Sequence, residues 1–494
     1  MINWIKKNKK EVFLLVLILL VGAFFRFYQI EGQATFLGDE GRDALVVKRM
    51  IVDHKFTMLG PTASFGNLYL GPMYYYFMVI PLWLSNLDPV GPAIMVACFG
   101  VLAIFMVYLI GRDFVNKEVG FFASALYAVS FPIIIHTRSS WNPNPMPFFA
   151  LLSYYALFRA LRDKNGKWLM VIGVSLGIAI QLHYMAIALI ASIFLILLLF
   201  RIKFSLKEYV FAFFSFCLLL SPQIIFEFRH HFVNSKALFD FFLGQGKFKD
   251  ESGIGLDRLV FLPLLVRLFE RFVAFGNTFI GTILAVVSSL TVIIVLFKEK
   301  LFRTKNLGLS ILFLWLLFGV MIIPLYRGTI HDHYLGFLFP VPFLFTGFLL
   351  SKILKTKAAK YISLLLFIAL LVFNLSKTNI FSSVGPNFQI QRSKTVAQTI
   401  ANDVGDKKFN IALVSPTKDF MALNYRYFLE IFGKQPEDYG NFNDIDILYV
   451  IEETKWINPE QLDLWELGTF GPFINAKDWT FDFQIMIYRL EHKK

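Results

Sequence analysis

The sequence predicts a polytopic α-helical membrane protein that carries a small α/β domain at its C-terminal end. Three observations support this fold class. The chain of 494 residues is 56% hydrophobic and only 17% charged, whereas a soluble protein carries about a quarter charged residues. Apolar runs of about 17–20 residues recur along most of the chain, and each is long enough to cross a bilayer. From about residue 377, short β-rich runs replace the long apolar ones.

The net charge of +13 raises the question of a nucleic-acid partner. The lysines and arginines, however, occur in short clusters between apolar runs. This placement is typical of loop charges that set membrane topology, and not of a basic binding face. We therefore expect membrane lipids as partners and no nucleic acid. Cys98 and Cys217 both lie in apolar runs, so a structural disulfide is not expected.

The basic clusters assign the loops to the two sides of the membrane, because Lys and Arg are enriched in cytoplasmic loops. The clusters lie at residues 6–10, 111–117, 159–167, 201–207, 298–305 and 351–360. The intervals between them hold eleven expected spans, near residues 11–29, 93–110, 119–136, 146–161, 167–182, 184–200, 208–226, 274–297, 307–326, 334–350 and 360–376. We expect a multi-pass plasma-membrane protein with a cytoplasmic N-terminus and an uncleaved first span.

The apolar segment at residues 71–86 does not fit as a span. It is short, contains Pro72 and Pro81, and is rich in Tyr and Trp, as interfacial segments are. If it crossed the membrane, the basic loop 111–117 would lie outside. We therefore expect residues 30–92 to form a long outer loop with juxtamembrane helices. The other outer segments are expected at residues 136–147, 181–185, 227–258 and 326–334.

Two domains follow from this topology. Residues 1–376 are expected to form the transmembrane domain, and residues 377–494 a soluble extracytoplasmic α/β domain. In the tail, the β-rich runs FNIALV, DIDILYVI and FDFQIMIYRL alternate with helical patterns, which is typical of an α/β fold. These runs lie at residues 409–414, 444–451 and 481–490, and the clearest helical pattern covers residues 418–432.

A charged stretch, FLGDEGRDALVVKRM at residues 36–50, follows the first span directly. A lipid-anchored substrate presents its head group at this depth, so an enzyme for such a substrate needs its catalytic groups here. A carboxylate beside an apolar region is suited to accept a proton, and Asp39 is therefore the candidate general base, with Glu40 in support. The alternative is that Asp39 only caps the helix expected at residues 40–51.

The motif DE-x-R-x-A, formed by Asp39, Glu40, Arg42 and Ala44, resembles the GT-C superfamily of polyprenyl-phosphate-sugar-dependent glycosyltransferases. Within that superfamily it is similar to the family-39-like branch of protein O-mannosyltransferases and aminoarabinose transferases. The topology of residues 1–350 is similar as well.

Two further segments carry the resemblance, each with a departure. LYLGPMYYY, at residues 68–76, stands where that branch has a PPL-x-Y segment, and Gly71 and Pro72 replace the usual double proline. The outer loop TRSSWNPNP has Arg138 in place of the family's arginine, but Asn142 stands where a second acid is expected. This departure weakens a mechanism that depends on a divalent metal.

The resemblance implies a transferase that moves a hexose or pentose from a polyprenyl-phosphate donor to an acceptor on the outer face, by inverting displacement, with Asp39 as the base. The acceptor, a protein, a lipid or a glycan, stays open. Arg42 and Arg138 are candidate ligands of the donor phosphate, since a guanidinium binds phosphate oxygens bidentately. The alternatives are a helix-face charge paired with Asp39 or Asp43 for Arg42, and a snorkelling side chain at a span end for Arg138.

Histidines and tyrosines complete the expected site. His333 and Tyr334 of the HDHY segment are expected to donate hydrogen bonds to the donor phosphate. The substrate pocket is expected to include Tyr69, Tyr74, Trp141, Asn142 and His183. No cofactor is expected. A zinc site is the alternative, but interfacial histidines need no metal; its ligands would be Glu40, His183, His331 and His333.

The alternative function is a polytopic lipid or solute transporter, or a flippase. Such proteins place ionisable residues near the bilayer midplane, often on broken helices. In this sequence the span interiors are nearly free of charge, and the polar residues gather at span ends. This asymmetry favours an enzyme.

Overall fold

The structure is a computed structural model, and it divides into two compact units. It describes residues 8–63, 68–242, 261–299, 306–326, 329–354, 357–378, 387–417, 419–454, 458–481 and 484–493. Unit 1 comprises Met1–Tyr28, Phe56–Phe77 and Ala93–Gly385, and unit 2 comprises Gln29–Lys55, Met78–Pro92 and Pro386–Lys494. The tail therefore shares a unit with two segments of the expected outer loop 30–92, which the sequence analysis had grouped with the transmembrane domain.

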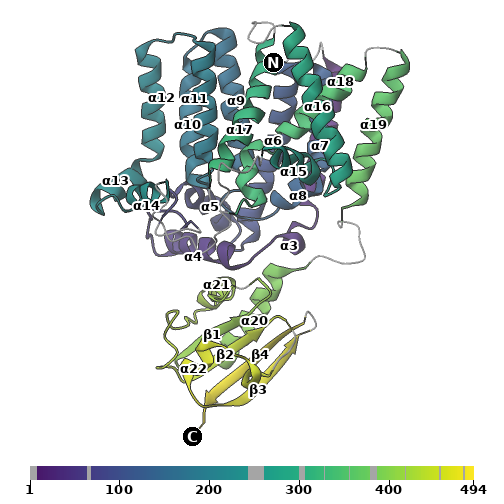
Figure 1. Ribbon diagram of the computed structural model, residues 1–494. Coiled ribbons are helices and arrows are strands. Elements are labelled where there is room, and N and C mark those ends of the chain that lie inside the picture. Colours follow the sequence, from purple (N-terminus) through teal and green to yellow (C-terminus); the bar gives the residue numbers. More distant parts are fainter. Residues whose placement is uncertain are drawn as a thin grey trace. The chain divides into compact units, whose positions relative to one another are not determined.

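Unit 1 is built from helices (Figure 1). They are α2 (Lys9–Phe27), α6 (Val90–Phe114), α7 (Lys117–Val129), α8 (Phe131–His136), α9 (Met146–Asp163), α10 (Lys167–Leu182), α11 (Ala186–Phe200), α12 (Leu206–Leu219), α13 (Ser221–Arg229), α14 (Val233–Phe242), α15 (Phe261–Phe272), α16 (Thr278–Glu299), α17 (Leu307–Ile322), η2 (Ile323–Leu325), η3 (Asp332–Leu338), α18 (Val341–Ile353) and α19 (Lys357–Ser376). In Figure 1, α9, α10, α11 and α12 run side by side, and α15 lies across the direction of the long helices.

One helix or two consecutive helices occupy most of each of the eleven expected spans. Within the described part of the chain, four helices are long and apolar enough to cross a membrane, namely α6, α16, α17 with η2, and α19. If each bent pair is counted as one span, this number rises to six; the pairs are α12 with α13, bent by 67°, and η3 with α18, bent by 52°. The protein is therefore a multi-pass helical membrane protein, and the count of eleven spans stays a prediction. The segment expected on the outer surface contains α5 (Met73–Leu84), a shorter apolar helix.

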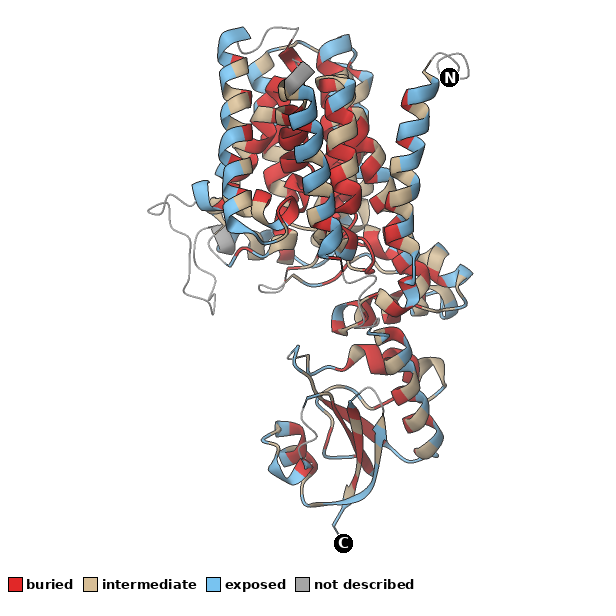
Figure 2. Ribbon diagram, turned by 90° about the vertical axis from the view of Figure 1, so that its right-hand side faces the viewer, coloured by how far each residue is buried: buried red, intermediate tan, exposed pale blue. Residues whose placement is uncertain are grey.

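The outward surface of unit 1 is apolar. Buried residues gather on the sides that the helices turn towards one another, and exposed residues line their outer sides (Figure 2). Large apolar side chains are exposed on α2, α16 and α19, such as Phe13, Phe297 and Leu365. Only 11% of the 18-residue apolar stretch of α19 is buried. Exposure of such an apolar surface to water is unfavourable, so these faces are suited to contact lipid.

Three of the segments expected on the cytoplasmic side contact one another at one end of these helices. Glu11 of α2 is buried; it accepts a hydrogen bond of 2.6 Å from the Tyr108 hydroxyl and forms an ion pair with Lys117. Asn116 donates to Ser351 over 3.0 Å, which brings the basic loops at 111–117 and 351–360 together. The opposite ends of α9 and α10, at Met146 and Leu182, carry the expected outer segments.

Unit 2 contains a four-stranded sheet and the helices around it (Figure 1). Its elements are α3 (Ile30–Gln33), α4 (Gly38–Val52), α20 (Gln389–Asp403), β1 (Phe409–Val414), α21 (Leu423–Ile431), β2 (Ile447–Glu452), η5 (Pro459–Gln461), α22 (Trp465–Phe470), β3 (Phe473–Phe481) and β4 (Ile485–His492). The strand order is β1-β2-β4-β3, with β1 and β2 parallel and the other pairs antiparallel. The runs that the sequence marked as β-rich provide β1, β2 and β4.

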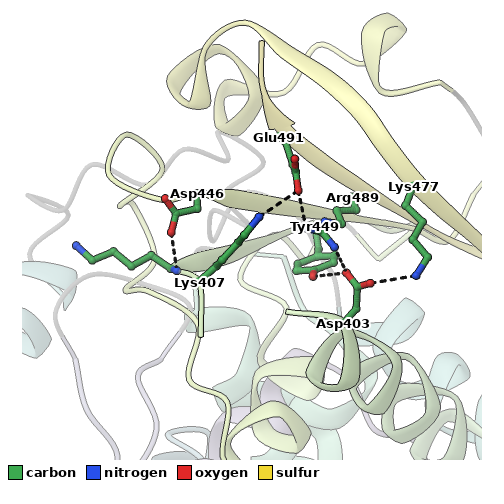
Figure 3. Close-up of polar contacts among 8 residues, drawn as sticks. Asp403, Lys407, Asp446, Tyr449, Lys477, Arg489 and Glu491 are labelled. Atoms are coloured by element: carbon green, nitrogen blue, oxygen red, sulfur yellow. Dashed lines mark hydrogen bonds and ion pairs between the residues drawn. The ribbon is translucent and has the colours of Figure 1, made fainter. Parts of the chain in front are cut away.

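Apolar residues of the sheet and of α22 form the core of unit 2, including Leu448, Val450 and Phe470. Asp403, at the end of α20, ties this helix to the sheet (Figure 3). Its carboxylate accepts hydrogen bonds from Tyr449 at 2.8 Å, Lys477 at 3.1 Å and Arg489 at 2.8 Å.

Helix α4 packs against α21 within unit 2. The contact is so close that a β-carbon at Gly41 would lie 2.3 Å from the backbone nitrogen of Asn424. Arg49 and Lys48 of α4 also form ion pairs with Glu430 of α21, at 2.6 Å and 3.4 Å. The helix that carries the acidic motif is therefore held by the tail domain.

Candidate functional site

The expected outer segments of unit 1 contact one another. The backbone carbonyl of Tyr69 accepts hydrogen bonds from the Tyr184 hydroxyl and, at 2.9 Å, from Gln223. The Tyr69 nitrogen donates to Asn234 over 2.8 Å. The Tyr74 hydroxyl lies 2.8 Å from the Ser140 hydroxyl. Residues from five separated parts of the chain thus form one surface at this end of the helices.

Arg138 is buried in this surface, with 3% of it exposed. Its Nη2 donates to the carbonyl of Tyr28, at the end of α2. Among the described residues, its Nε has no hydrogen-bond partner and no carboxylate pairs with it. Burial lowers the pKa of Arg138 to about 10, so the guanidinium keeps its charge at neutral pH. A buried cation without a counter-ion is suited to bind an anion.

An aromatic and imidazole cluster lies in the same surface. His333 is central to it: its ring centroid is 4.4 Å from that of Trp141, 5.4 Å from His183 and 4.6 Å from Tyr334. His183 and Tyr334 are 4.8 Å apart by the same measure. Three segments that the sequence analysis expects in outer loops therefore meet here.

His183 occupies the short turn between α10 and α11. Its Nδ1 accepts a hydrogen bond of 3.1 Å from the Met185 nitrogen, so Nε2 carries the proton of the neutral ring. Burial, followed by the charge of His333, lowers the pKa of His183 to about 3. At neutral pH His183 is therefore an uncharged hydrogen-bond donor. Asn142 donates to the neighbouring Leu182 carbonyl over 2.7 Å, and its amide holds this turn in place.

Two arginines were missed by the sequence analysis. Arg267 of α15 donates to Asp332 at 2.9 Å and 2.5 Å and to the Ile330 carbonyl at 2.8 Å, and so fixes the segment that presents His333. Its signal in the sequence is the strongly amphipathic pattern of residues 261–272, which also holds Arg271. Arg26 is fully buried at the end of α2 and donates to the Ala128 carbonyl over 3.1 Å. An arginine inside an apolar span is a signal in itself.

The histidines do not fit a metal site. The rings of His331 and His333 are stacked, with centroids 5.6 Å apart and planes within 12°. An imidazole binds a metal in the plane of its ring, so stacked rings do not direct their nitrogens at one point. In the described segments, no group of three or more His, Cys, Asp or Glu side chains could hold a metal ion. No step of the reaction is therefore assigned to a metal.

The acidic motif begins α4 in unit 2. The carboxylate of Glu40 accepts a hydrogen bond of 3.1 Å from the Leu37 nitrogen, so Glu40, and not Asp39, caps this helix. Asp39 accepts one of 2.7 Å from Arg42, and half of its side chain is exposed. The capping role that was the alternative for Asp39 is thus filled by its neighbour.

Arg42 lies between two carboxylates of its own helix. Besides the bond to Asp39, its Nε donates to Asp43 over 2.9 Å, and Asp43 is fully buried. This is the paired helix-face charge that the sequence left open as the alternative for Arg42. In this arrangement Arg42 orients Asp39.

Residues 70–226 match the family described as dolichyl-phosphate-mannose-protein mannosyltransferase. This range contains Tyr74, Arg138, Trp141, Asn142 and His183. No curated protein sequence matches the chain.

Solved structures of the same fold cover nearly the whole chain. ArnT from Cupriavidus metallidurans, bound to undecaprenyl phosphate, matches with a TM-score of 0.62 at 12% identity, over 98% of each chain. The archaeal oligosaccharyltransferase AglB from Archaeoglobus fulgidus, in complex with an inhibitory peptide and a dolichol-phosphate, matches with a TM-score of 0.54 at 13% identity, over 91% of this chain and 70% of its own. A second structure of the Archaeoglobus fulgidus oligosaccharyltransferase, with Zn and sulfate, gives 0.51 at 14% identity, over 89% and 68%.

The structures establish the fold, and the family match bears on the kind of enzyme. Together they confirm the resemblance predicted from Asp39, Glu40, Arg42 and Ala44: the chain has the GT-C fold, and its predicted class, a membrane glycosyltransferase, is confirmed.

Proposed function

We propose that the protein transfers a sugar from a polyprenyl-phosphate donor to an acceptor at the outer face of the membrane, by inverting displacement at the anomeric carbon. One observation carries the proposal. Arg138, Trp141, His183, His333 and Tyr334 gather at the end of the helices opposite the basic loops. This end of the helices thus holds a cation, hydrogen-bond donors and a flat indole, which suits a phosphate linked to a sugar.

Asp39 acts as the general base. It takes the proton of the acceptor hydroxyl while that oxygen attacks the anomeric carbon. The bond between this carbon and the phosphate oxygen breaks, and the polyprenyl phosphate leaves with the bonding electrons. The hydrogen bond from Arg42 orients the carboxylate, and Glu40 supports Asp39 by capping the helix on which it stands.

The departing phosphate needs positive charge and hydrogen-bond donors. Arg138 supplies the charge, and His333 and Tyr334 supply donors. The charge of Arg42 is already balanced by the carboxylates of Asp39 and Asp43. We therefore assign it the smaller part in binding the donor.

The remaining predicted pocket residues divide into two kinds. Trp141 and His183 belong to the cluster around His333 and would contact the sugar. The Tyr74 hydroxyl is hydrogen-bonded to Ser140, and the Asn142 amide donates to the Leu182 carbonyl. Tyr69 holds neighbouring segments through hydrogen bonds of its backbone. These three residues shape the pocket.

The polyprenyl-phosphate donor is supported by the lipid phosphates bound in the ArnT and AglB structures. The placement of the N-terminus in the cytoplasm, and of the tail domain outside, rests on the basic loops. The acceptor stays open between a protein, a lipid and a glycan. A transporter or flippase is not favoured, because the family match is to a transferase.

The test is transfer of label. Purified protein in liposomes is given radiolabelled polyprenyl-phosphate sugars and a membrane extract, and label should move from the lipid to an acceptor. Asp39→Asn is nearly isosteric and should lower turnover by about 10²–10⁴-fold while donor binding persists. Asp53→Asn, at the exposed C-cap of the same helix, is the control and should turn over normally. A folded Asp39→Asn variant with turnover within about threefold of wild type would refute the role of Asp39.

A further inference from the structure

Unit 2 contains a cavity of about 190 Å³ between the start of α4, α20, α21 and the sheet. A cavity of about 150 Å³ holds a benzene ring, so this one has room for a six-membered sugar ring. Most of its lining is polar. Gln389, Arg392, Ser415, Asn424 and Glu453 supply amide, guanidinium, hydroxyl and carboxylate groups.

The polar lining is only partly satisfied by the protein itself. Asn424, which is 4% exposed, donates through Nδ2 to Ser393 over 3.0 Å. Its Oδ1 is buried and has no hydrogen-bond partner within the described ranges. Leaving such an oxygen unpaired costs about 1–3 kcal/mol, which a hydroxyl group of a ligand would offset.

The charges of the lining balance. Arg392 and Glu453 are its charged side chains among the described residues. Burial, together with the charge of Glu453, raises the pKa of Tyr425, so the Tyr425 hydroxyl keeps its proton and donates to Glu453. A phosphate would need a surplus of cations, and the described lining residues provide none. A neutral ligand fits this balance.

A neutral ligand with many hydroxyl groups fits the lining best. Each hydroxyl both donates and accepts, so it can pair with the amide of Asn424, the carboxylate of Glu453 and the guanidinium of Arg392. Phe36, Leu37 and Ile485 add apolar surface on which the C–H groups of a sugar ring can pack. Sugars combine these two properties.

The cavity lies close to the proposed base within the same unit. Leu37 lines it and is the N-cap of α4, and Asp39 follows two residues later. Asp419, which precedes α21, is so near that a β-carbon at Gly38 would lie 2.3 Å from its carboxylate. We propose that this cavity binds a neutral sugar residue of the acceptor, so that the acceptor is a glycan or a glycan-bearing molecule. The acceptor part of this inference rests on the proposed function.

The test measures binding without any donor. Full-length protein, purified in a detergent without a sugar head group, is examined by saturation-transfer NMR. The probes are the methyl glycosides of glucose, galactose, mannose and N-acetylglucosamine, with glycerol phosphate and the tripeptide Gly-Ser-Gly for comparison. At least one glycoside should receive saturation, and neither comparison compound should.

Variants locate the binding. Asn424→Leu and Arg392→Met should weaken it at least tenfold, whereas Asn402→Leu, exposed near the end of α20, should not change it. Because Asn424 is buried, Ser415→Ala and Thr417→Ala at the more exposed side of the cavity provide a second test, with binding weakened severalfold in a folded protein. The proposal is overturned if wild type binds no glycoside, if the peptide or the phosphate binds instead, or if the cavity variants bind as wild type does.

The same assay separates this inference from the proposed function. Asp39→Asn should bind the glycoside as wild type does. If that variant also keeps its turnover, the role of Asp39 fails while the sugar site stands. If Asp39→Asn loses its turnover but wild type binds no glycoside, the sugar site fails while the role of Asp39 stands.

Discussion

The two ends of the helices in unit 1 treat charge differently. At the end with the basic loops, Glu11 is surrounded by Tyr108, Arg112 and Lys117, and the charges satisfy one another. At the other end, Arg138 is buried beside backbone carbonyls, and no carboxylate of the described chain pairs with it. Removing one partner of a buried pair destabilises a fold, and a buried cation without a counter-ion likewise costs stability unless a ligand supplies the anion. We therefore expect the first end to contribute to stability and the second to bind the donor.

The largest effect is expected for Arg138. Because a hydrogen bond to a charged group contributes about 1.5–3 kcal/mol, Arg138→Ala should weaken binding of the polyprenyl-phosphate sugar by about 10- to 100-fold. Arg112→Ala, at the paired end, is the matched control and should leave donor binding unchanged. Equilibrium binding of labelled donor measures both variants. Equal losses in the two would remove the distinction between the ends.

Glu11 should affect stability and not turnover. Glu11→Gln keeps the size of the side chain but leaves Lys117 without its carboxylate partner and Arg112 with Asp113 alone, at a cost of about 1–3 kcal/mol. Denaturant unfolding in detergent measures this loss, and donor transfer measures turnover. Glu118→Gln, exposed on α7, should change neither quantity. A drop in turnover of folded Glu11→Gln would contradict the comparison.

The network around Asp403 in Figure 3 resembles the end of unit 1 with the basic loops, because its charges are paired as well. Burial alone would raise the pKa of Asp403, but hydrogen bonds from Tyr449 and Lys477 and the charge of Arg489 lower it. A lowered folded-state pKa adds stability above the unfolded value of about 3.9, and this stability is lost as the pH falls through the folded value.

Asp403→Asn should therefore destabilise unit 2 by about 2 kcal/mol at pH 7 and by less as the pH falls below about 4. Unfolding followed at several pH values measures the effect. Asp406→Asn, whose side chain is fully exposed, serves as the control. An equal loss at pH 7 and pH 3 would show that packing, and not charge, is responsible.

Arg267 should give the smallest effect, because its ion pair with Asp332 is partly exposed and such pairs are worth up to about 1 kcal/mol. Arg267→Ala should loosen the segment that holds His333 and weaken donor binding by up to about fivefold. Arg267→Lys should restore part of this loss. Arg271→Ala, 3.4 Å from the same carboxylate and more exposed, should have less effect. A large fall in turnover with unchanged donor binding would contradict this positioning role.

Much of unit 1 could be predicted because lipid imposes long apolar runs and basic residues mark their ends. The expected span 167–182 coincides with α10, and the outer loops expected around Arg138, His183 and His333 do meet. Helix α15 was missed because it mixes arginines with leucines at helical spacing and follows a polar loop. Such a helix is recognised by its periodicity and not by its mean hydropathy.

In unit 2 strands β1, β2 and β4 were predictable, and the edge strand β3 was not. The residues of β2 are all buried and are apolar up to Glu452, whereas those of β3 are mostly exposed and mix polar with apolar residues. The partners of Arg42 also needed coordinates, since its spacing to Asp39 and Asp43 allows either a pairing within the helix or a bound phosphate. The contact of α4 with α21 joins residues far apart in the sequence, and no local pattern announces it.

The close approach at Gly41 has a consequence for acceptor length. Any side chain at this position would push α21 away from α4, because even a β-carbon would meet the backbone of Asn424. Helix α4 carries the proposed base, and α21 forms one wall of the proposed sugar cavity. Because residue 41 is a glycine and has no β-carbon, the two helices can lie at this short separation. The two helices then act as a molecular ruler: a hydroxyl is in reach of Asp39 only if it lies a set distance along the glycan from the sugar in the cavity. An acceptor with one sugar more or one sugar fewer would place its hydroxyl out of reach of Asp39. It would be rejected because of its length, without any contact that recognises the added unit.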